Sequence, residues 1–229
     1  MLSLEHVMLR NGAFTLSVDL TLQKGQRLGL IGASGSGKST LLNLVAGFLV
    51  PDTGRILIDG SDVSRTDVAS RPLGILFQDG NLFPHLSAFD NVALGLRPDL
   101  RLSESQREAV TACLDQVGMA AHADRLPKVL SGGQQSRVAL ARMLLRDKPL
   151  ALLDEPFSAL DPGLRRDMLG LVSDLCDQAR LTLILVTHDL REVQNLCTDL
   201  CLLDKGQVTI RGEMQTILSD PPAALRPWL

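Results

Sequence analysis

Three short runs, almost wholly apolar, constrain the fold of this 229-residue chain more than any other feature. They are residues 28–31 (LGLI), 150–153 (LALL) and 181–186 (LTLILV). A continuous apolar run is typical of a parallel strand that is covered on both faces, whereas a strand with one wet face alternates apolar and polar residues. Because a helical pattern follows each run, we expect an α/β fold with a central parallel sheet.

The N-terminal part of the chain shows a different pattern. Residues 15–25 (TLSVDLTLQKG) place apolar side chains at every second position, and residues 54–60 (GRILIDG) place Ile56 and Ile58 on one face. Alternation of this kind predicts half-buried antiparallel strands. We therefore expect an N-terminal antiparallel β subdomain beside the parallel sheet.

The strand signal lapses between Asn91 and Leu126. Residues 103–118 begin with a capping box of Ser103 and Gln106 and continue with a helical apolar stripe of Val110, Leu114 and Val117. We expect one domain over residues 1–229, with a helical subdomain at about residues 91–139. The catalytic core would then comprise about residues 1–90 and 140–229.

Composition excludes several classes of protein. The chain has 23 Lys and Arg against 26 Asp and Glu, a net charge of −3, so no basic excess indicates a nucleic-acid partner. No run approaches the roughly 18 apolar residues of a membrane span, and the N-terminus lacks an apolar signal core. We expect a cytoplasmic protein whose cysteines, which form no C-x-x-C pair, pack in the core: Cys113, Cys176, Cys197 and Cys201.

Residues 32–40 (GASGSGKST) match the phosphate-loop pattern G-x-x-x-x-G-K-[ST]. The context fits, because an apolar strand precedes the motif and a helical pattern follows it and ends at Gly47. Backbone N–H groups of such a loop and the helix N-terminus bind phosphate, Lys38 adds charge and Ser39 a ligand for Mg²⁺. The expected phosphate-binding residues are Gly32, Ala33, Ser34, Gly35, Ser36, Gly37, Lys38, Ser39 and Thr40.

Carboxylates follow the second apolar run, and a histidine follows the third. Asp154 and Glu155 are placed where open sheets bind ligands, at the carboxyl edge, and His188 is placed at the same edge. We expect Asp154 to hold the metal through water and Glu155 to polarise an attacking water as general base. The alternative is that both carboxylates only cap the next turn. Asp161 is the expected N-cap of the following helix, with Pro162 in its first turn.

A second pair of glycines, in residues 130–134 (LSGGQ), opens another helix. Ser131 and Gln134 form a capping box, and the expected buried stripe is Val138, Ala141, Leu144 and Leu145. The N-terminus of this helix is a second anion site. A chain cannot easily bend its own helical lobe over the phosphates in its first loop, whereas a second copy facing it could. The motif therefore favours a head-to-tail dimer with two shared sites.

The order of these motifs resembles the nucleotide-binding subunit of ABC transporters over nearly the whole chain. The resemblance implies ATP as substrate with Mg²⁺, a homodimer, and closure of Ser131, Gly132, Gly133 and Gln134 on the γ-phosphate held by the other subunit. It also implies three further roles. Gln78 would contact Mg²⁺ and the attacking water, His188 would hold the γ-phosphate, and Asp161 would lie at the dimer seam.

The same resemblance implies a place on the cytoplasmic face of the inner membrane, as a peripheral subunit of an importer. Residues 79–87 (DGNLFPHLS) would receive a helix from an integral membrane permease, and a periplasmic or extracellular solute-binding protein would act indirectly. For residues 79–87, plain core packing of Leu82, Phe83 and Leu86 is an equal alternative. No nucleic acid is expected as a partner.

Residues 76–102 and 154–165 are most similar to the ATPase subunits of thiamine importers. Importers of iron(III), sulfate and polyamines carry close variants, and an ATPase subunit does not touch the cargo, so these remain alternatives. A soluble ABC ATPase that acts on nucleic acid or ribosomes is a further alternative, against which the single phosphate loop argues. A module that binds ATP without hydrolysis is disfavoured because Glu155 and His188 are both present.

The chain departs from the family pattern at the adenine contact. Members usually stack adenine on an aromatic residue, often Tyr, near the end of the first strand, and this chain has no Tyr. Leu9, Arg10 and Phe14 are the available residues, and the contact stays unassigned. Ser136 replaces a residue that is more often Gln in relatives, on a helix surface where little depends on it.

Overall fold

A computed structural model of the chain describes residues 1–77, 81–158 and 160–229. Gln78 therefore lies outside the described residues. The chain forms two compact units. The first comprises Met1–Leu73, Pro149–Glu155 and Val172–Leu229, and the second comprises Gly74–Lys148 and Pro156–Leu171.

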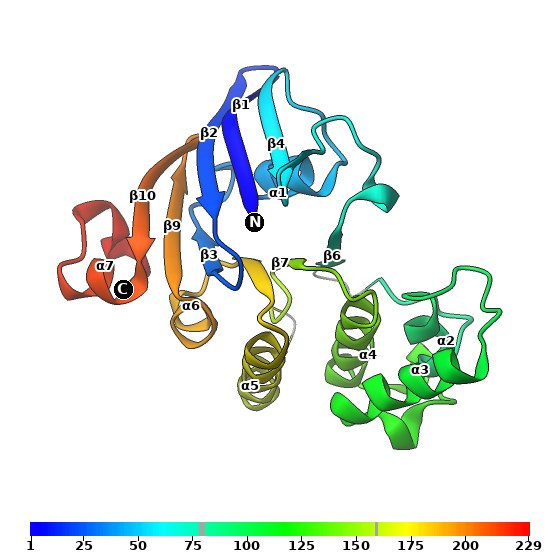
Figure 1. Ribbon diagram of the computed structural model, residues 1–229. Helices are drawn as coiled ribbons and strands as arrows, with labels where there is room; N and C mark the ends of the chain where they lie inside the picture. The colour runs from blue at the N-terminus through cyan, green and yellow to red at the C-terminus, as the bar shows by residue number, and fades with distance from the viewer. Residues whose placement is uncertain (78–80, 159) are drawn as a thin grey trace. The chain divides into compact units, whose positions relative to one another are not determined.

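The first unit is built on a mixed sheet with the strand order β5-β4-β1-β2-β10-β9-β3-β8-β7. Figure 1 shows the last strands, in orange, beside β2, in blue, so the two ends of the chain contribute adjacent strands. A further strand, β6 (Leu73–Leu76), lies where the first unit passes into the second. The strands of the sheet are β1 (Leu2–Asn11), β2 (Phe14–Leu22), β3 (Arg27–Ile31), β4 (Thr53–Ile58), β5 (Ser61–Asp62), β7 (Leu150–Asp154), β8 (Thr182–Val186), β9 (Asp199–Asp204) and β10 (Gln207–Glu213).

The three apolar runs form the parallel part of this sheet, as predicted. β3 pairs in parallel with β8 and β9, and β7 pairs in parallel with β8. Leu30, Leu152 and Leu185, one from each run, are fully buried. α1 (Lys38–Ala46) packs against β7, and α6 (Leu190–Leu196) packs against β3. Cover by helices explains why these strands carry apolar residues without alternation.

The antiparallel part also agrees with the sequence pattern. β1 pairs with β2 and with β4 in antiparallel register, and the alternating residues of β2 and β4 are buried. Alternation in the sequence did not identify β1 itself. A β-bulge around His6, whose φ is 51°, shifts the register between Leu4 and Val7 and interrupts the alternation on which strand prediction depends.

The second unit is helical. It contains α2 (Ala88–Ala93), α3 (Glu104–Gln116), α4 (Gly132–Leu144) and the first turns of α5 (Pro162–Ala179), which continues into the first unit. The predicted capping box of Ser103 and Gln106 is present at the start of α3. The predicted stripe is confirmed, because Val110, Leu114 and Val117 are fully buried. α2 packs against α3 and α4, which gives this unit its own core.

All four cysteines are buried and free, which confirms that they pack in the core. Burial raises the pKa of the Cys113 and Cys176 thiols to about 11 and that of Cys201 to about 12. Such thiols stay protonated and unreactive at neutral pH.

The C-terminal segment packs on the sheet unit through α7 (Met214–Ser219) and the fully buried Leu225.

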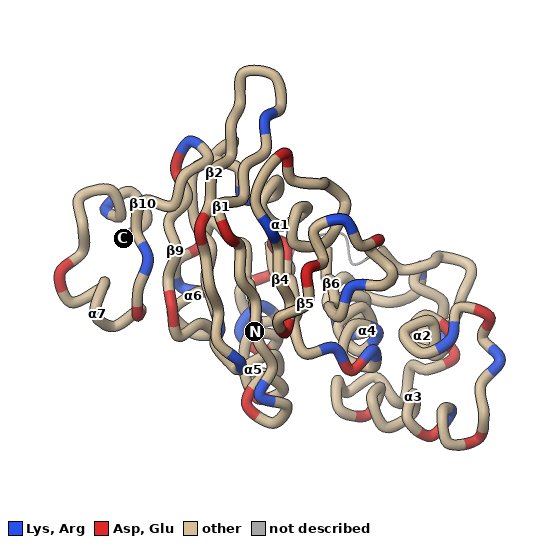
Figure 2. Tube along the Cα trace, turned by 45° about the horizontal axis from the view of Figure 1, so that its top comes forward, with Lys and Arg blue, Asp and Glu red and all other residues tan. Residues whose placement is uncertain are grey.

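In the part of the chain that Figure 2 colours, Lys and Arg positions are interspersed with Asp and Glu positions along the trace. No helix among the described residues is long and apolar enough to cross a membrane. The short 3₁₀ turns are Val68–Ser70, Ala120–His122, Pro127–Val129 and Ala223–Trp228.

Candidate functional site

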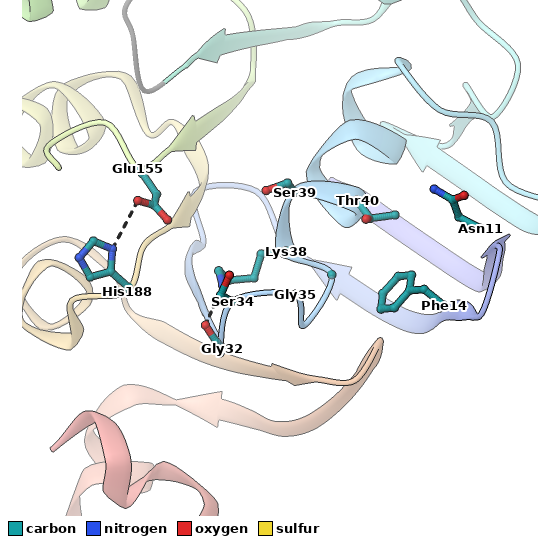
Figure 3. A pocket seen from close by; sticks show the side chains of 11 residues that line it. Asn11, Phe14, Gly32, Ser34, Gly35, Lys38, Ser39, Thr40, Glu155 and His188 are labelled. Carbon is teal, nitrogen blue, oxygen red and sulfur yellow. Dashed lines mark hydrogen bonds and ion pairs between the residues drawn. The ribbon is translucent and has the colours of Figure 1, made fainter. Parts of the chain in front are cut away.

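A pocket of about 520 Å³ lies in the first unit, beside the glycine-rich loop that follows β3. Figure 3 shows residues after β3, β7 and β8 together with residues at the β1–β2 turn. The carboxyl edge of a parallel sheet is the usual ligand site of an open α/β fold. The lining residues are Asn11, Phe14, Gly32, Ser34, Gly35, Gly37, Lys38, Ser39, Thr40, Glu155 and His188.

The path of the loop depends on two glycines. A Cβ atom at Gly32 would collide with the carbonyl oxygen of Leu203. Gly37 is the N-cap of α1 with φ 105°, a left-handed conformation that L side chains rarely adopt. A Cβ atom there would also lie 2.7 Å from Cζ of Phe14. The loop can therefore turn directly into α1, whose first N–H groups have no partner within the helix and can bind an anion.

Lys38 supplies the positive charge of the loop. Its Nζ donates hydrogen bonds to the carbonyl oxygens of Gly32 at 2.7 Å and Ala33 at 3.1 Å. Burial lowers the pKa of Lys38, and the nearby carboxylates of Glu155 and Asp154 oppose this shift. An ammonium group held by two carbonyls and near two carboxylates is suited to bind the oxygens of a phosphate that also binds a metal ion.

The two carboxylates at the end of β7 have different surroundings. Burial raises the pKa of the Asp154 carboxyl, the charge of Glu155 raises it further, and Lys38 opposes both effects. Asp154 does not belong to the lining of the pocket as far as the chain is described. Glu155 does, and its φ of 45° turns the backbone away from the strand, while its N–H still donates to the carbonyl of Val186 at 2.9 Å.

His188 lies beside Glu155 at one side of the pocket. The Nδ1 atom of His188 lies 3.4 Å from Oε2 of Glu155, as the dashed line in Figure 3 marks. The Glu155 side chain is 29% exposed and that of His188 is 66% exposed. A half-buried carboxylate beside an exposed imidazole, both next to an anion-binding loop, can hold and polarise a water molecule near a bound phosphate.

The predicted helix starts of the second unit are confirmed. Ser131 is the N-cap of α4 and forms a complete capping box with Gln134. The Asp161 carboxylate accepts hydrogen bonds from the N–H groups of Gly163 and Leu164, both at 3.0 Å, so it caps α5. Sequence reasoning linked both glycines of the LSGGQ segment to phosphate. In the structure, Gly133 is buried and a Cβ there would collide with Leu164, whereas Gly132 faces open space.

Asn11 is a pocket residue that sequence reasoning missed. It is the last residue of β1, and Gly12 follows it with φ 59° in the turn to β2. Asn-Gly between two strands is a strong hairpin signal, so the turn could have been predicted. Phe14, already a candidate for the adenine contact, begins β2 and lines the same pocket.

Comparison with known proteins identifies the class. The family model for ABC transporters matches residues 16–158, so the chain belongs to the ABC transporter family. Its relatives include the thiamine import ATP-binding protein ThiQ of Jannaschia sp. (strain CCS1), which is 60% identical over 229 residues covering 100% of both chains. The protein of the same name from Shigella flexneri is 46% identical over 209 residues, covering 91% of this chain and 90% of its own length.

Solved structures give the same assignment. The dimeric post-hydrolysis structure of the ATP-binding cassette MJ0796, bound to ADP and Pi, superposes with a TM-score of 0.81 at 31% identity, covering 93% of this chain and 99% of that one. The ADP conformation of the cassette MJ1267 gives 0.87 at 27% identity, covering 96% and 95%. The chain is therefore an ATP-binding ABC ATPase, and the predicted P-loop α/β fold of ABC type is confirmed.

Proposed function

We propose that this protein is the ATP-hydrolysing subunit of an importer that takes up thiamine through separate membrane subunits. The ATPase part rests on the pocket that joins the phosphate loop to Glu155 and His188. The thiamine part is supported by 60% identity over the full length to a protein named as a thiamine import ATP-binding protein. An ATPase subunit of this kind would lie at the cytoplasmic face of the inner membrane as a peripheral protein.

The phosphates of ATP bind in the loop of residues 32–40. Backbone N–H groups of the loop and of the first turn of α1 donate to the phosphate oxygens, and Lys38 adds a full positive charge. The loop carbonyls that now accept from Lys38 keep its Nζ within reach of the phosphates. The base and ribose extend toward Asn11 and Phe14, which line the same pocket beyond the phosphate loop.

Mg²⁺ is the metal that fits these residues. The described residues contain no cluster of three or more His, Cys, Asp or Glu that could hold a metal alone. Mg²⁺ needs no such cluster, because proteins bind it through one or two carboxylates, water and substrate phosphates. The hydroxyl of Ser39 and, through water, the carboxylate of Asp154 would hold it, and it would neutralise charge on the phosphates.

Glu155 acts as the general base in this proposal. Its carboxylate accepts a proton from the water that attacks the γ-phosphate, and the adjacent imidazole of His188 holds the γ-phosphate and keeps the carboxylate oriented. The proposal also gives Gln78 a contact to Mg²⁺ and to the attacking water, although Gln78 lies outside the described residues.

A second copy of the chain completes the site. In the proposed head-to-tail homodimer, Ser131, Gly132, Gly133 and Gln134 at the start of α4 close on the γ-phosphate bound by the partner, and Asp161 lies at the seam. The open space beside Gly132 supports this role, because a bound phosphate can approach the backbone there closely. The MJ0796 cassette, which is a relative of the same fold, is dimeric with ADP and Pi.

The second unit would transmit closure to the membrane partner. We propose that it includes the helical subdomain of about residues 91–139, and that residues 79–87 receive a helix of the permease. Phe83 is 47% exposed, which favours docking of this side chain over plain core packing. ATP binding would close the dimer, and hydrolysis would reopen it.

Uptake of labelled thiamine by cells with and without this gene tests the proposal, with uptake of iron(III) and sulfate as parallel controls. Selective loss of thiamine uptake, restored by the wild-type gene but not by Glu155→Gln, is the expected result. Loss of a different solute would overturn the thiamine part alone. Full restoration by Glu155→Gln would overturn the role of Glu155.

A further inference from the structure

Glu192 is the one buried carboxylic side chain in the part of the chain that the structure describes, and the proposed mechanism gives it no role. It is 3% exposed and lies in the first turn of α6, directly after the turn that carries His188. A carboxylic acid is costly to bury unless its oxygens are hydrogen-bonded. A specific partner is therefore expected to explain its position.

One such partner is Thr187, which is 1% exposed. The Thr187 hydroxyl donates to Oε2 of Glu192 at 2.6 Å and accepts the N–H of Asp189 at 3.1 Å. The two bonds form a short chain from the backbone after His188, through the Thr187 side chain, to the carboxyl of α6. Linked hydrogen bonds of this kind polarise and strengthen one another in a buried setting.

Two further hydrogen bonds fix Thr187 and Asp189, the residues on either side of His188. The Thr187 N–H donates to the carbonyl of Leu30 in β3 at 3.3 Å. The carboxylate of Asp189 accepts the N–H of Arg191 at 2.9 Å and so caps α6, which carries Glu192. The backbone on both sides of His188 is therefore tied to elements of the sheet unit.

His188 needs such support from its backbone. Its side chain is 66% exposed, so packing restricts the imidazole little, yet its Nδ1 lies only 3.4 Å from Glu155. A small rotation of the backbone at residues 187–189 would move the ring out of this contact. Displacements of about 1 Å in an active site can reduce turnover about 100-fold.

We propose that Thr187 and Glu192 are positioning residues that hold His188 against Glu155 for ATP hydrolysis. The inference rests on the proposed role of His188 in hydrolysis. Neither residue lines the pocket as far as it is described, so both act through His188 and neither touches the nucleotide.

The test compares Thr187→Val, which keeps the shape but removes the hydroxyl, with Thr187→Ser, which keeps the hydroxyl. Two quantities are measured on the full-length protein. One is steady-state ATP hydrolysis, and the other is the order of the His188 ring from ¹³C relaxation of the imidazole. His6, His85 and His122 serve as internal references.

For Thr187→Val we expect a loss of about 10- to 100-fold in kcat with KM for ATP nearly unchanged, and a more mobile His188 ring. Thr187→Ser should restore both. An unchanged His188 ring in Thr187→Val would overturn the proposal. A mobile ring with normal hydrolysis would instead overturn the role of His188 in the proposed function.

Glu192 provides a second pair of variants in case Thr187→Val does not fold. Glu192→Gln keeps the volume and a carbonyl oxygen that can accept from Thr187, so it should resemble the wild type. Glu192→Leu removes the acceptor and should reproduce the loss of kcat and of ring order. Equal behaviour of the two Glu192 variants would contradict the hydrogen-bond chain.

Discussion

Arg71 is the most deeply buried cation among the described residues, and its replacement by Met tests how the phosphate-loop helix is held. Arg71 is 1% exposed, and burial lowers the pKa of its guanidinium. A guanidinium is the most basic group among protein side chains, so it stays charged despite this shift. Nη1 donates to the carbonyl oxygens of Leu44 at 2.7 Å and Val45 at 2.8 Å, and Nε donates to that of Thr66 at 3.0 Å.

The carbonyls of Leu44 and Val45 belong to the last turn of α1, which ends at Ala46. The last carbonyls of a helix have no partner within the helix, and a cation there also favours the helix dipole. Gly47 follows with φ 95°, and a Cβ at Gly47 would lie 2.6 Å from Nε of Arg71. The C-terminus of α1 is therefore built around this guanidinium.

The expected loss of stability follows from these bonds. Removing the partner of a buried polar group costs about 1–3 kcal/mol per group, and three bonds of Arg71 are 3.0 Å or shorter. Some of the freed carbonyls will accept hydrogen bonds from water. For Arg71→Met we therefore expect the free energy of unfolding to fall by an amount near the lower end of the summed range, about 3–5 kcal/mol. For a chain of this length the melting temperature falls by about 2–4 °C per kcal/mol, so the expected decrease is about 6–20 °C.

Thermal unfolding followed by circular dichroism measures this decrease. Arg71→Lys should lower the melting temperature less than Arg71→Met, because the ammonium group of Lys can still reach the helix carbonyls. Arg65→Met is the matched control, since Arg65 is exposed in the same loop and its loss should leave the melting temperature unchanged. A decrease of less than about 2 °C for Arg71→Met would refute the reasoning.

Three further predictions concern Asp154, Gly29 and Ser131; the first two are measured by thermal unfolding and the third by ATP binding and hydrolysis. Asp154→Asn should raise the melting temperature at pH 8 while it abolishes hydrolysis, because burial raises the pKa of this carboxyl and so disfavours its ionised form. The gain should shrink as the pH falls through that raised pKa, and no gain at pH 8 would contradict the electrostatic account. Gly29→Ala should cost about 1–3 kcal/mol because its Cβ would collide with Val193, and Val193→Ala in the same chain should recover part of the loss. Ser131→Arg should leave ATP binding to one subunit intact but reduce hydrolysis at least about tenfold, and full activity would argue against shared sites.

Features set by local chemistry could be predicted from the sequence. The runs at residues 28–31, 150–153 and 181–186 form parallel strands because helical cover demands apolar side chains on both faces. The capping boxes at Ser103 and Ser131 involve residues only three positions apart, so the pattern alone identifies them. The same local logic found the phosphate loop.

Features that depend on distant partners could not be predicted. Arg71 binds carbonyls 26 and 27 residues away, and nothing near it in the sequence distinguishes it from an exposed arginine. The role of Gly133 in packing could not be predicted either, because the side chain that it contacts, Leu164, belongs to another helix. A glycine needed for packing and a glycine needed for phosphate look alike in sequence, and only Gly132 has open space beside it.

Asp154 and Glu155 show how the backbone separates the roles of neighbouring carboxylates. In a regular strand, successive side chains point to opposite faces, so extending β7 by one residue would carry Glu155 away from the face of Asp154. Instead φ at Glu155 is 45°, a conformation that costs about 1–3 kcal/mol in a residue other than glycine. The Glu155 N–H stays bound to Val186, so the turn changes the direction of the side chain without detaching the backbone from β8. The strained turn places Glu155 in the pocket beside His188, the position of the proposed base, while Asp154 is not among the lining residues as far as the chain is described. Since strain of this kind persists only where the surrounding structure enforces it, the hydrogen bond from the Glu155 N–H to Val186 in β8 belongs to the proposed site as much as the carboxylate that it helps to direct.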